Sequence, residues 1–244
     1  MDLQDWLSHK RYLTEGVRRI TTPAGEGILV DGILSTKQEQ ALIAASLRPP
    51  SGSIVLKFGS RSFVGAAPIA DSRLALKYYS RLSLRRQLGY TLMGTRAMRS
   101  WIAARTFVKL GLPTPEPIAL VESQRFGFIK DRSLFVTRMA EGVSLREFAK
   151  QHASDTQALE KLATEARRIF QTFAEFRIYH GDTNTKNFIV TPDGQLSIID
   201  LDACEFLVPE NQWQKKRRSD ERKFSRLWQD SPELAEIFKD VFKP

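Results

Sequence analysis

The chain has 244 residues, 42% of them hydrophobic and 27% charged, which is ordinary for a globular protein with a core of its own. Its formal net charge is +9, and its single cysteine, Cys204, excludes an internal disulfide framework and fits a reducing compartment. No apolar run approaches the ~20 residues that span a bilayer, and the acidic start resembles no signal peptide, so we expect an intracellular protein.

The first half of the chain predicts a small sheet with two helices. A short helix is expected over residues 35–47, and the Pro-Pro-Ser-Gly sequence at 49–52 then breaks the chain. Strands are expected over residues 54–58, 62–66, 73–79 and 134–139. A second helix is expected over residues 95–110, because Gly111 and Pro113 stop it.

The second half predicts helices around one short hairpin. Ser144-Leu-Arg-Glu147 is a capping box that opens a helix, and apolar residues at helical spacing predict a long helix over residues 155–177. Ser231-Pro-Glu233 caps a final helix. The fold class is therefore α+β and two-lobed, with a small β-rich lobe over residues 1–139, N-terminal extension included, and a mainly helical lobe over residues 140–244.

The most informative motif is His180-Gly-Asp182-Thr-Asn-Thr-Lys-Asn187, followed by Asp200-Leu-Asp202. Protein kinases have His-Arg-Asp, four residues and Asn in their catalytic loop, and then Asp-Phe-Gly. Two short apolar strands over residues 188–199, joined at Pro192-Asp-Gly194, would carry Asn187 and Asp200 to the same end of a hairpin. Phosphoryl transfer requires such a set, with a carboxylate for the acceptor hydroxyl and oxygen ligands for magnesium.

Four segments together resemble the bacterial lipopolysaccharide core kinases, protein-kinase-like enzymes that phosphorylate Kdo or heptose. They are Ala75-Leu-Lys77-Tyr-Tyr, Trp101 with Gly111-Leu-Pro-Thr-Pro115, His180-Gly-Asp182 through Asn187-Phe, and Ile199-Asp-Leu-Asp202-Ala. The resemblance covers roughly residues 54–205. It implies the protein-kinase-like fold with ATP and Mg²⁺ as cofactors.

The resemblance also implies a role for individual residues. Lys77 would hold the nucleotide phosphates, and Asp182 would accept the proton of the acceptor hydroxyl as the catalytic carboxylate. Asn187 and Asp200 would be the magnesium ligands, so that Lys77, Asp182, Asn187 and Asp200 form the cofactor-binding set. The backbone of residues 135–139 would meet the adenine.

Three departures from the kinase pattern leave questions open. Kinases usually have a Glu on this helix that pairs with the strand lysine, but the corresponding position here is Ser100, and residues 95–110 contain no acid. Lys77 would then pair with another carboxylate, or with Asp200 and the nucleotide. The usual Lys two residues after the catalytic Asp is Asn184, and the turn at residues 59–61 is poor in glycine. A nucleotide-binding pseudokinase that acts as a scaffold is therefore an alternative.

The charge is unevenly placed. Residues 72–115 hold nine basic residues and no acid, whereas the run Lys215-Lys-Arg-Arg218 reads as a solvated face. The expected patch for substrate or membrane comprises Arg81, Arg85, Arg86, Arg96 and Arg99, with Leu84, Leu88, Tyr90, Leu92 and Met93 dipping into the headgroup region. We expect a lipid-linked anionic glycan as substrate and a peripheral place at the cytoplasmic face of the inner membrane. We expect no nucleic-acid partner, because aromatic residues are not interleaved with the basic ones as a stacking platform requires.

The sequence thus predicts an ATP-dependent kinase of a Kdo or heptose sugar in the lipopolysaccharide inner core. Besides the pseudokinase, a kinase of a protein or of a soluble small molecule stays open.

Overall fold

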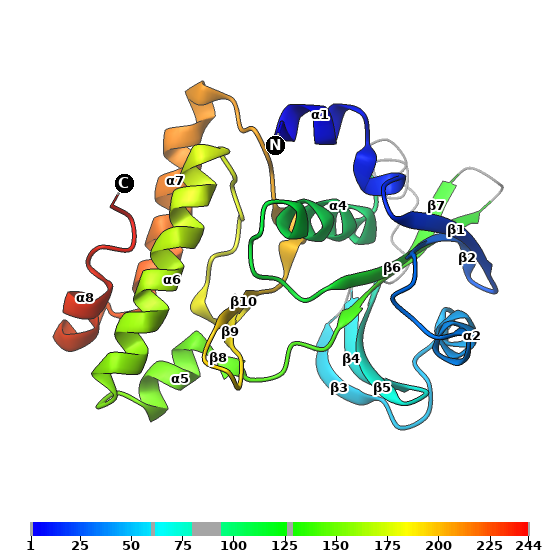
Figure 1. Ribbon diagram of the computed structural model, residues 1–244, viewed down its shortest axis with the longest axis horizontal. Coiled ribbons are helices and arrows are strands. Elements are labelled where there is room, and N and C mark those ends of the chain that lie inside the picture. The colour runs from blue at the N-terminus through cyan, green and yellow to red at the C-terminus, as the bar shows by residue number, and fades with distance from the viewer. Residues whose placement is uncertain (1, 60–61, 80–93, 126–128, 244) are drawn as a thin grey trace. The chain divides into compact units, whose positions relative to one another are not determined.

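The computed structural model describes residues 2–59, 62–79, 94–125 and 129–243 (Figure 1). The chain forms two compact units: Met1–Thr106 with Pro115–Met139, and Phe107–Thr114 with Ala140–Pro244. The segment 107–114, which the sequence-based division places in the first lobe, therefore belongs to the second unit. Within the described ranges, no helix combines the length and the apolar character needed to cross a membrane.

The first unit is built on an antiparallel sheet of seven strands. In sheet order these are β1 (Val17–Thr22), β2 (Gly25–Val30), β6 (Pro117–Arg125), β7 (Ile129–Arg138), β5 (Ser72–Tyr79), β4 (Ser62–Ile69) and β3 (Ile54–Gly59). The three strands expected over residues 54–79 are confirmed as β3, β4 and β5. The strand expected over residues 134–139 is the end of the longer β7.

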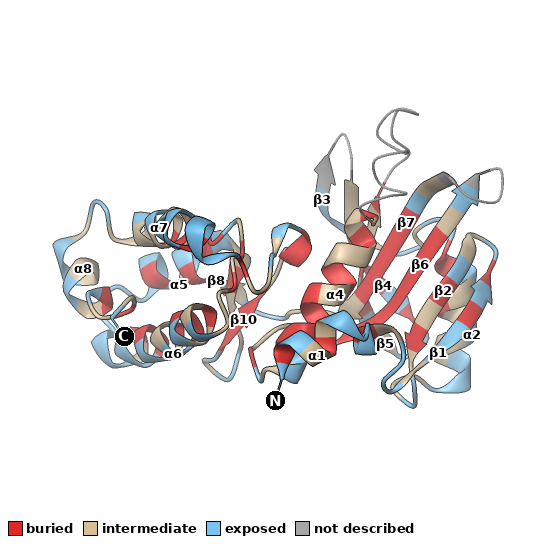
Figure 2. Cartoon of the chain, turned by 90° about the horizontal axis from the view of Figure 1, so that it is seen from above, coloured by how far each residue is buried: buried red, intermediate tan, exposed pale blue. Residues whose placement is uncertain are grey.

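Two helices cover opposite faces of this sheet (Figure 1). Because successive residues of a strand point to opposite faces, Tyr78 and Tyr79 at the end of β5 reach different helices. The Tyr78 hydroxyl donates a hydrogen bond to the Ala45 carbonyl of α2 (Thr36–Ala45), at 2.6 Å. The Tyr79 hydroxyl lies 3.1 Å from the Ser100 hydroxyl of α4 (Arg96–Lys109). Figure 2 shows that buried residues follow α4 and the central strands β6 and β7.

The N-terminal residues form elements that the sequence pattern did not reveal. Helix α1 (Leu3–Ser8) and a 3₁₀ turn (Arg11–Leu13) precede β1. Helix α1 is too short to establish a periodic apolar pattern, and β1 and β2 form a hairpin with little apolar alternation. These elements depend on the contacts that they make with distant parts of the unit.

The second unit is mainly helical. Its helices are α5 (Leu145–Gln151), α6 (Thr156–Glu175), α7 (Glu210–Phe224) and α8 (Pro232–Phe238), with 3₁₀ turns at Thr185–Asn187, Leu201–Ala203 and Ser225–Leu227. A small antiparallel sheet has the order β10 (Leu196–Ile198), β9 (Phe188–Val190) and β8 (Val143–Ser144). Helix α6 and the β9–β10 hairpin confirm the expectation from the sequence.

Helix α7 was not predicted, because Pro209 before it offers no capping side chain and its sequence is highly charged. It carries the basic run at residues 215–218. Lys216 and Arg217 pair with Glu205 and Glu221, and the other two basic residues of the run are exposed. These positions agree with a solvated face.

Candidate active site

The catalytic loop of the second unit lies between the end of α6 and the start of β9. His180 is fully buried, and its ring is nearly parallel to the rings of Phe173 and Phe188 at 6.4 and 6.3 Å. Burial is the main cause that lowers the pKa of His180 from 6.5 to about 4, so the ring is neutral at physiological pH. Its Nδ1 accepts a hydrogen bond from the Asp182 N–H at 3.2 Å. The histidine therefore shapes the backbone of the loop and does not serve as a base.

Asp182 and Asn187 contact each other directly. The Asn187 Nδ2 donates to the Asp182 backbone oxygen and to its Oδ2, both at 2.9 Å. The Asp182 side chain is exposed, so the carboxylate can meet an acceptor molecule. Because the Asn187 Nδ2 donates to Asp182, the other atom of the amide group, Oδ1, is the one that can bind a metal ion.

The β9–β10 hairpin brings Asn187 and Asp200 to its same end, as expected. Phe188 pairs with Ile198 across the hairpin, and the Ile199 N–H donates to the Asn187 carbonyl at 2.9 Å. Asp200 follows with φ 64° and ψ 51°, a left-handed conformation that Asp tolerates better than most residues. The hairpin thus places Asp200 one residue beyond the hydrogen bond between Ile199 and Asn187.

Asn187 and Asp200 offer side-chain oxygens, the ligand type that magnesium prefers. Among the described residues, no three His, Cys, Asp or Glu side chains form a cluster that could hold a metal ion. Magnesium usually takes one or two protein oxygen ligands and completes its octahedron with water and substrate phosphates. The oxygens of Asn187 and Asp200 match that requirement.

The glycine of His-Gly-Asp is required by its surroundings. Gly181 has φ +85°, and a Cβ at this position would lie 2.9 Å from the Ala203 Cβ and 3.0 Å from the Ala203 oxygen. Any side chain would therefore push the loop away from the turn that follows Asp200.

Asp220 of α7 anchors the loop and was missed by the sequence analysis. Its side chain, 3% exposed, accepts hydrogen bonds from the His180 N–H at 2.8 Å and from the Gly181 N–H at 3.2 Å. The Thr183 hydroxyl donates to the Asp220 backbone oxygen at 2.6 Å. Burial raises the pKa of Asp220 from 3.8 to about 6, against these hydrogen bonds and the nearby Lys223. One signal was available, because Trp213, Asp220 and Phe224 share a helical face, and an acid between buried aromatic residues needs a partner.

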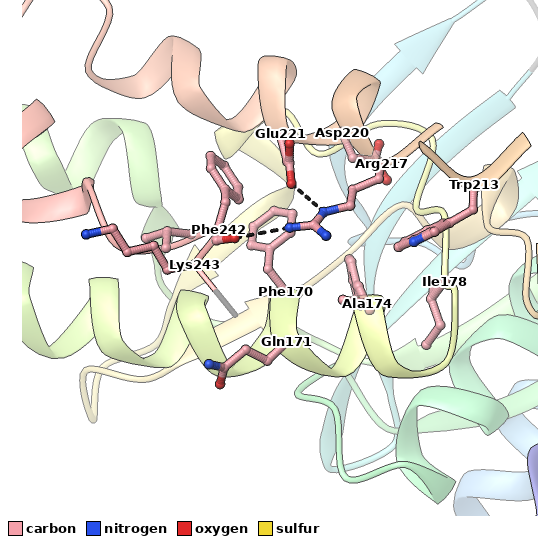
Figure 3. A pocket seen from close by; sticks show the side chains of 12 residues that line it. Phe170, Gln171, Ala174, Ile178, Trp213, Arg217, Asp220, Glu221, Phe242 and Lys243 are labelled. Atoms are coloured by element: carbon pink, nitrogen blue, oxygen red, sulfur yellow. Dashed lines mark hydrogen bonds and ion pairs between the residues drawn. The ribbon is translucent and has the colours of Figure 1, made fainter. Parts of the chain in front are cut away.

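The side of α7 that carries Asp220 also borders a cavity of about 50 Å³ in the second unit (Figure 3). Arg217 spans its rim, donating from Nε to the Glu221 Oε1 at 2.6 Å and from Nη2 to the Phe242 oxygen at 3.1 Å. The Phe242 ring packs edge-on against Phe170 of α6 at 4.9 Å. These contacts fix α7 to α6 and to the C-terminal segment, so that Asp220 is held in register with the loop.

Lys77 lies on β5 of the first unit, opposite Phe135 of β7. It is partly buried, and its Nζ lies 5.5 Å from the centre of the Tyr79 ring. Ser100 of α4, which stands where kinases have an acid, is 1% exposed and contacts the Tyr79 hydroxyl. The Tyr79 ring of β5 therefore lies close to this lysine, and Ser100 of α4 contacts the hydroxyl of that ring.

The remaining predicted residues have mixed positions. Arg81, Arg85 and Arg86, with the apolar residues 84–93 expected to join them, lie outside the described residues. Arg96 and Arg99 are both partly buried on α4, and the Arg96 guanidinium lies 5.1 Å from the centre of the Tyr79 ring. At the position of the usual loop lysine, the Asn184 side chain accepts from the Lys186 N–H at 3.1 Å and caps the 3₁₀ turn before β9.

Comparisons with known proteins agree with this geometry. The family model "Lipopolysaccharide kinase (Kdo/WaaP) family" matches residues 66–229. Two 3-deoxy-D-manno-octulosonic acid kinases of Xylella fastidiosa, from strains M12 and 9a5c, are 26% and 25% identical over 122 residues, 50% of this chain and 47% of each relative. The chain thus spans about half the length of the curated relatives it matches. A solved structure of WaaP in complex with acyl carrier protein has a TM-score of 0.56 at 17% identity over 77% of both chains, which shows a shared protein-kinase-like fold.

Proposed function

The chain belongs to the lipopolysaccharide kinase (Kdo/WaaP) family, and we therefore propose that it is an ATP-dependent kinase that phosphorylates a hydroxyl of Kdo or heptose in the lipopolysaccharide inner core. The observation that supports the proposal most is the anchored loop, in which the exposed Asp182 accepts a hydrogen bond from Asn187 and the two residues before it donate to Asp220. A loop with this architecture supports phosphoryl transfer to an alcohol.

Each residue has a separate task in this proposal. Asp182 orients the acceptor hydroxyl and takes its proton, a contribution that is typically ~100-fold or more in rate. Asn187 and Asp200 would hold Mg²⁺, which bridges the nucleotide phosphates and neutralises the charge that develops during transfer. Lys77 would hold the ATP phosphates. The neutral His180 keeps the Asp182 backbone in place and takes no proton.

The acceptor that we propose is a lipid-linked anionic glycan at the cytoplasmic face of the inner membrane. The acid-free stretch 72–115 supports this, because each basic residue near an anionic surface contributes ~1 kcal/mol. Arg81, Arg85, Arg86, Arg96 and Arg99 are the proposed contacts. Of these, Arg96 and Arg99 are both partly buried on α4.

The test is transfer from Mg·ATP to a lipid-linked Kdo or heptose acceptor, followed by mass spectrometry of the glycan. We expect a phosphorylated glycan with the native protein and none with Asp182→Asn, although that variant should bind Mg·ATP normally. Retention of more than about a tenth of the activity would show that Asp182 is not the base. Transfer to a polypeptide alone would favour a protein kinase, and Mg·ATP binding without any transfer would favour a pseudokinase.

A further inference from the structure

Lys77 has no acid from α4 to orient it. The sequence of α4, Arg-Ala-Met-Arg-Ser-Trp-Ile-Ala-Ala-Arg-Thr-Phe-Val-Lys, contains no Asp or Glu. In protein kinases an ion pair between the strand lysine and a helix Glu must be in place for transfer. If Lys77 binds the nucleotide phosphates, as in the proposed function, a group other than a carboxylate of α4 has to orient its side chain.

Tyr79 is placed to do so from the same strand. Residues two apart on a strand share a face, so Lys77 and Tyr79 both point to the α4 side of the sheet. The Lys77 Nζ lies 5.5 Å from the centre of the Tyr79 ring, within the ~6 Å range of a cation–π contact. The ring is 4% exposed, so water screens this contact little.

Helix α4 in turn fixes Tyr79. The hydroxyls of Tyr79 and Ser100 lie 3.1 Å apart, and the Ser100 side chain is 1% exposed. The Arg96 guanidinium, one turn earlier on α4, lies 5.1 Å from the centre of the same ring. Two residues of α4 therefore meet the ring that Lys77 contacts.

Helix α4 is also held by the N-terminal segment, whose helix α1 lies beside it (Figure 1) and which precedes the residues that the family model matches. The indole of Trp6 donates to the Thr106 hydroxyl at 3.1 Å, and the indole of Trp101 donates to the Tyr12 carbonyl at 2.9 Å. Both hydrogen bonds are buried, so α4 has a fixed position from which Ser100 can act.

We propose that Tyr79 and Ser100 are positioning residues for Lys77 that replace the usual ion pair between a helix acid and the strand lysine. The Ser100 hydroxyl fixes the Tyr79 ring, and the ring face fixes the Lys77 ammonium. Helix α4 thereby controls nucleotide binding without a carboxylate of its own.

The experiment is calorimetric titration of Mg·ATP into the full chain and its variants. One hydrogen bond contributes ~0.5–1.5 kcal/mol, so Tyr79→Phe and Ser100→Ala should each weaken Mg·ATP binding about 2- to 10-fold. The double variant Tyr79→Phe/Ser100→Ala should bind Mg·ATP as tightly as either single variant, because each of the three removes the same hydrogen bond between Tyr79 and Ser100. Tyr79→Leu, which also removes the ring, should weaken binding more than Tyr79→Phe.

Two controls separate positioning from a general loss of structure. Tyr78→Phe removes a hydroxyl from the adjacent residue on the other face of β5, where it bonds to Ala45, and should lower the melting temperature without changing Mg·ATP affinity. In a Lys77→Met background, Tyr79→Phe should cause no further loss of affinity. A further loss there, or an equal loss in Tyr78→Phe, would overturn the proposal.

The Mg·ATP affinity of the Lys77→Met variant distinguishes a failure of the proposed function from a failure of the positioning role of Tyr79 and Ser100. Unchanged Mg·ATP affinity in that variant would refute the proposed role of Lys77 and the positioning role with it. A strong loss in Lys77→Met with none in Tyr79→Phe would refute the positioning role alone.

Discussion

The Asp220 side chain both anchors the catalytic loop and carries a buried charge, and the variant Asp220→Asn tests the two roles by different measurements. The carboxylate accepts hydrogen bonds from the His180 and Gly181 amides, and it is also a buried charge. Asn keeps one acceptor oxygen and removes the charge, but its amide group would face a backbone N–H donor. We therefore expect the catalytic loop to shift, and a misplacement of about 1 Å can cost ~100-fold in kcat.

The buried charge makes the stability difference depend on pH. The pKa of Asp220 rises from 3.8 to about 6 on folding, which corresponds to about 3 kcal/mol. Because the folded value is the higher one, the carboxyl contributes this stability fully below pH 3.8 and loses it as the pH rises through about 6. Asn does not titrate. The stability of the native chain relative to Asp220→Asn should therefore fall by about 3 kcal/mol between pH 3.5 and pH 7.

The assay is urea unfolding of both proteins over this pH range, together with kcat at neutral pH. Glu221→Gln is the matched control, because this adjacent carboxylate binds Arg217 and does not contact the loop. Parallel stability curves for the native chain and Asp220→Asn would refute the buried-charge argument. An unchanged kcat in Asp220→Asn would refute the anchoring role of Asp220.

Three further predictions concern the metal ligand, the loop glycine and the basic stretch. Asp200→Asn should weaken ATP binding in the presence of Mg²⁺ only, and a magnesium titration identical to that of the native chain would contradict the ligand role. Gly181→Ala should lower both the melting temperature and kcat, because the new Cβ would lie 2.9 Å from the Ala203 Cβ. Adding Ala203→Gly should restore part of both quantities, and no restoration would contradict the steric cause. Replacing Arg85 and Arg86 by Glu should weaken binding to anionic vesicles well over tenfold at low salt, because each basic residue near the surface contributes ~1 kcal/mol. ATP affinity should not change. Vesicle binding equal to that of the native chain would refute the membrane contact.

The sequence revealed the elements whose signals are local. The β9–β10 hairpin follows from two apolar runs around a Pro-Asp-Gly turn, and α6 follows from a long stripe of apolar residues. Strand β6 begins with a proline, and β1 and β2 carry weak alternation, so their pairing depends on the neighbouring strands. Helix α7 is stabilised by burial of Trp213 and Phe224, which tertiary packing provides.

The candidate site divides in the same way. Asp182, Asn187 and Asp200 could be predicted because one loop and one hairpin bring them together. Asp220 and Ser100 could not, since their roles depend on which distant groups they meet: two backbone amides in one case and the Tyr79 hydroxyl in the other. A missing acid on α4 was visible in the sequence, but the hydroxyl contact that stands in its place was not.

The pattern of departures from the kinase motif bears on the choice between an enzyme and a scaffold. The buried charge of Asp220 costs stability at neutral pH, and Asp200 has a left-handed backbone, a conformation that Asp tolerates better than most residues but that only glycine adopts without steric cost. Both features persist only where the surrounding structure compensates for them, and Asp220 holds the Asp182 loop through the His180 and Gly181 amides. The position of the missing helix acid is filled by a packed hydroxyl pair, with Ser100 almost fully buried. A scaffold that only binds nucleotide would gain stability by giving up a buried carboxylate behind its acceptor-binding loop, whereas a kinase needs that loop fixed. The buried carboxylate of Asp220 therefore supports the proposed kinase over the scaffold, with Lys77 oriented in the way proposed for Tyr79 and Ser100.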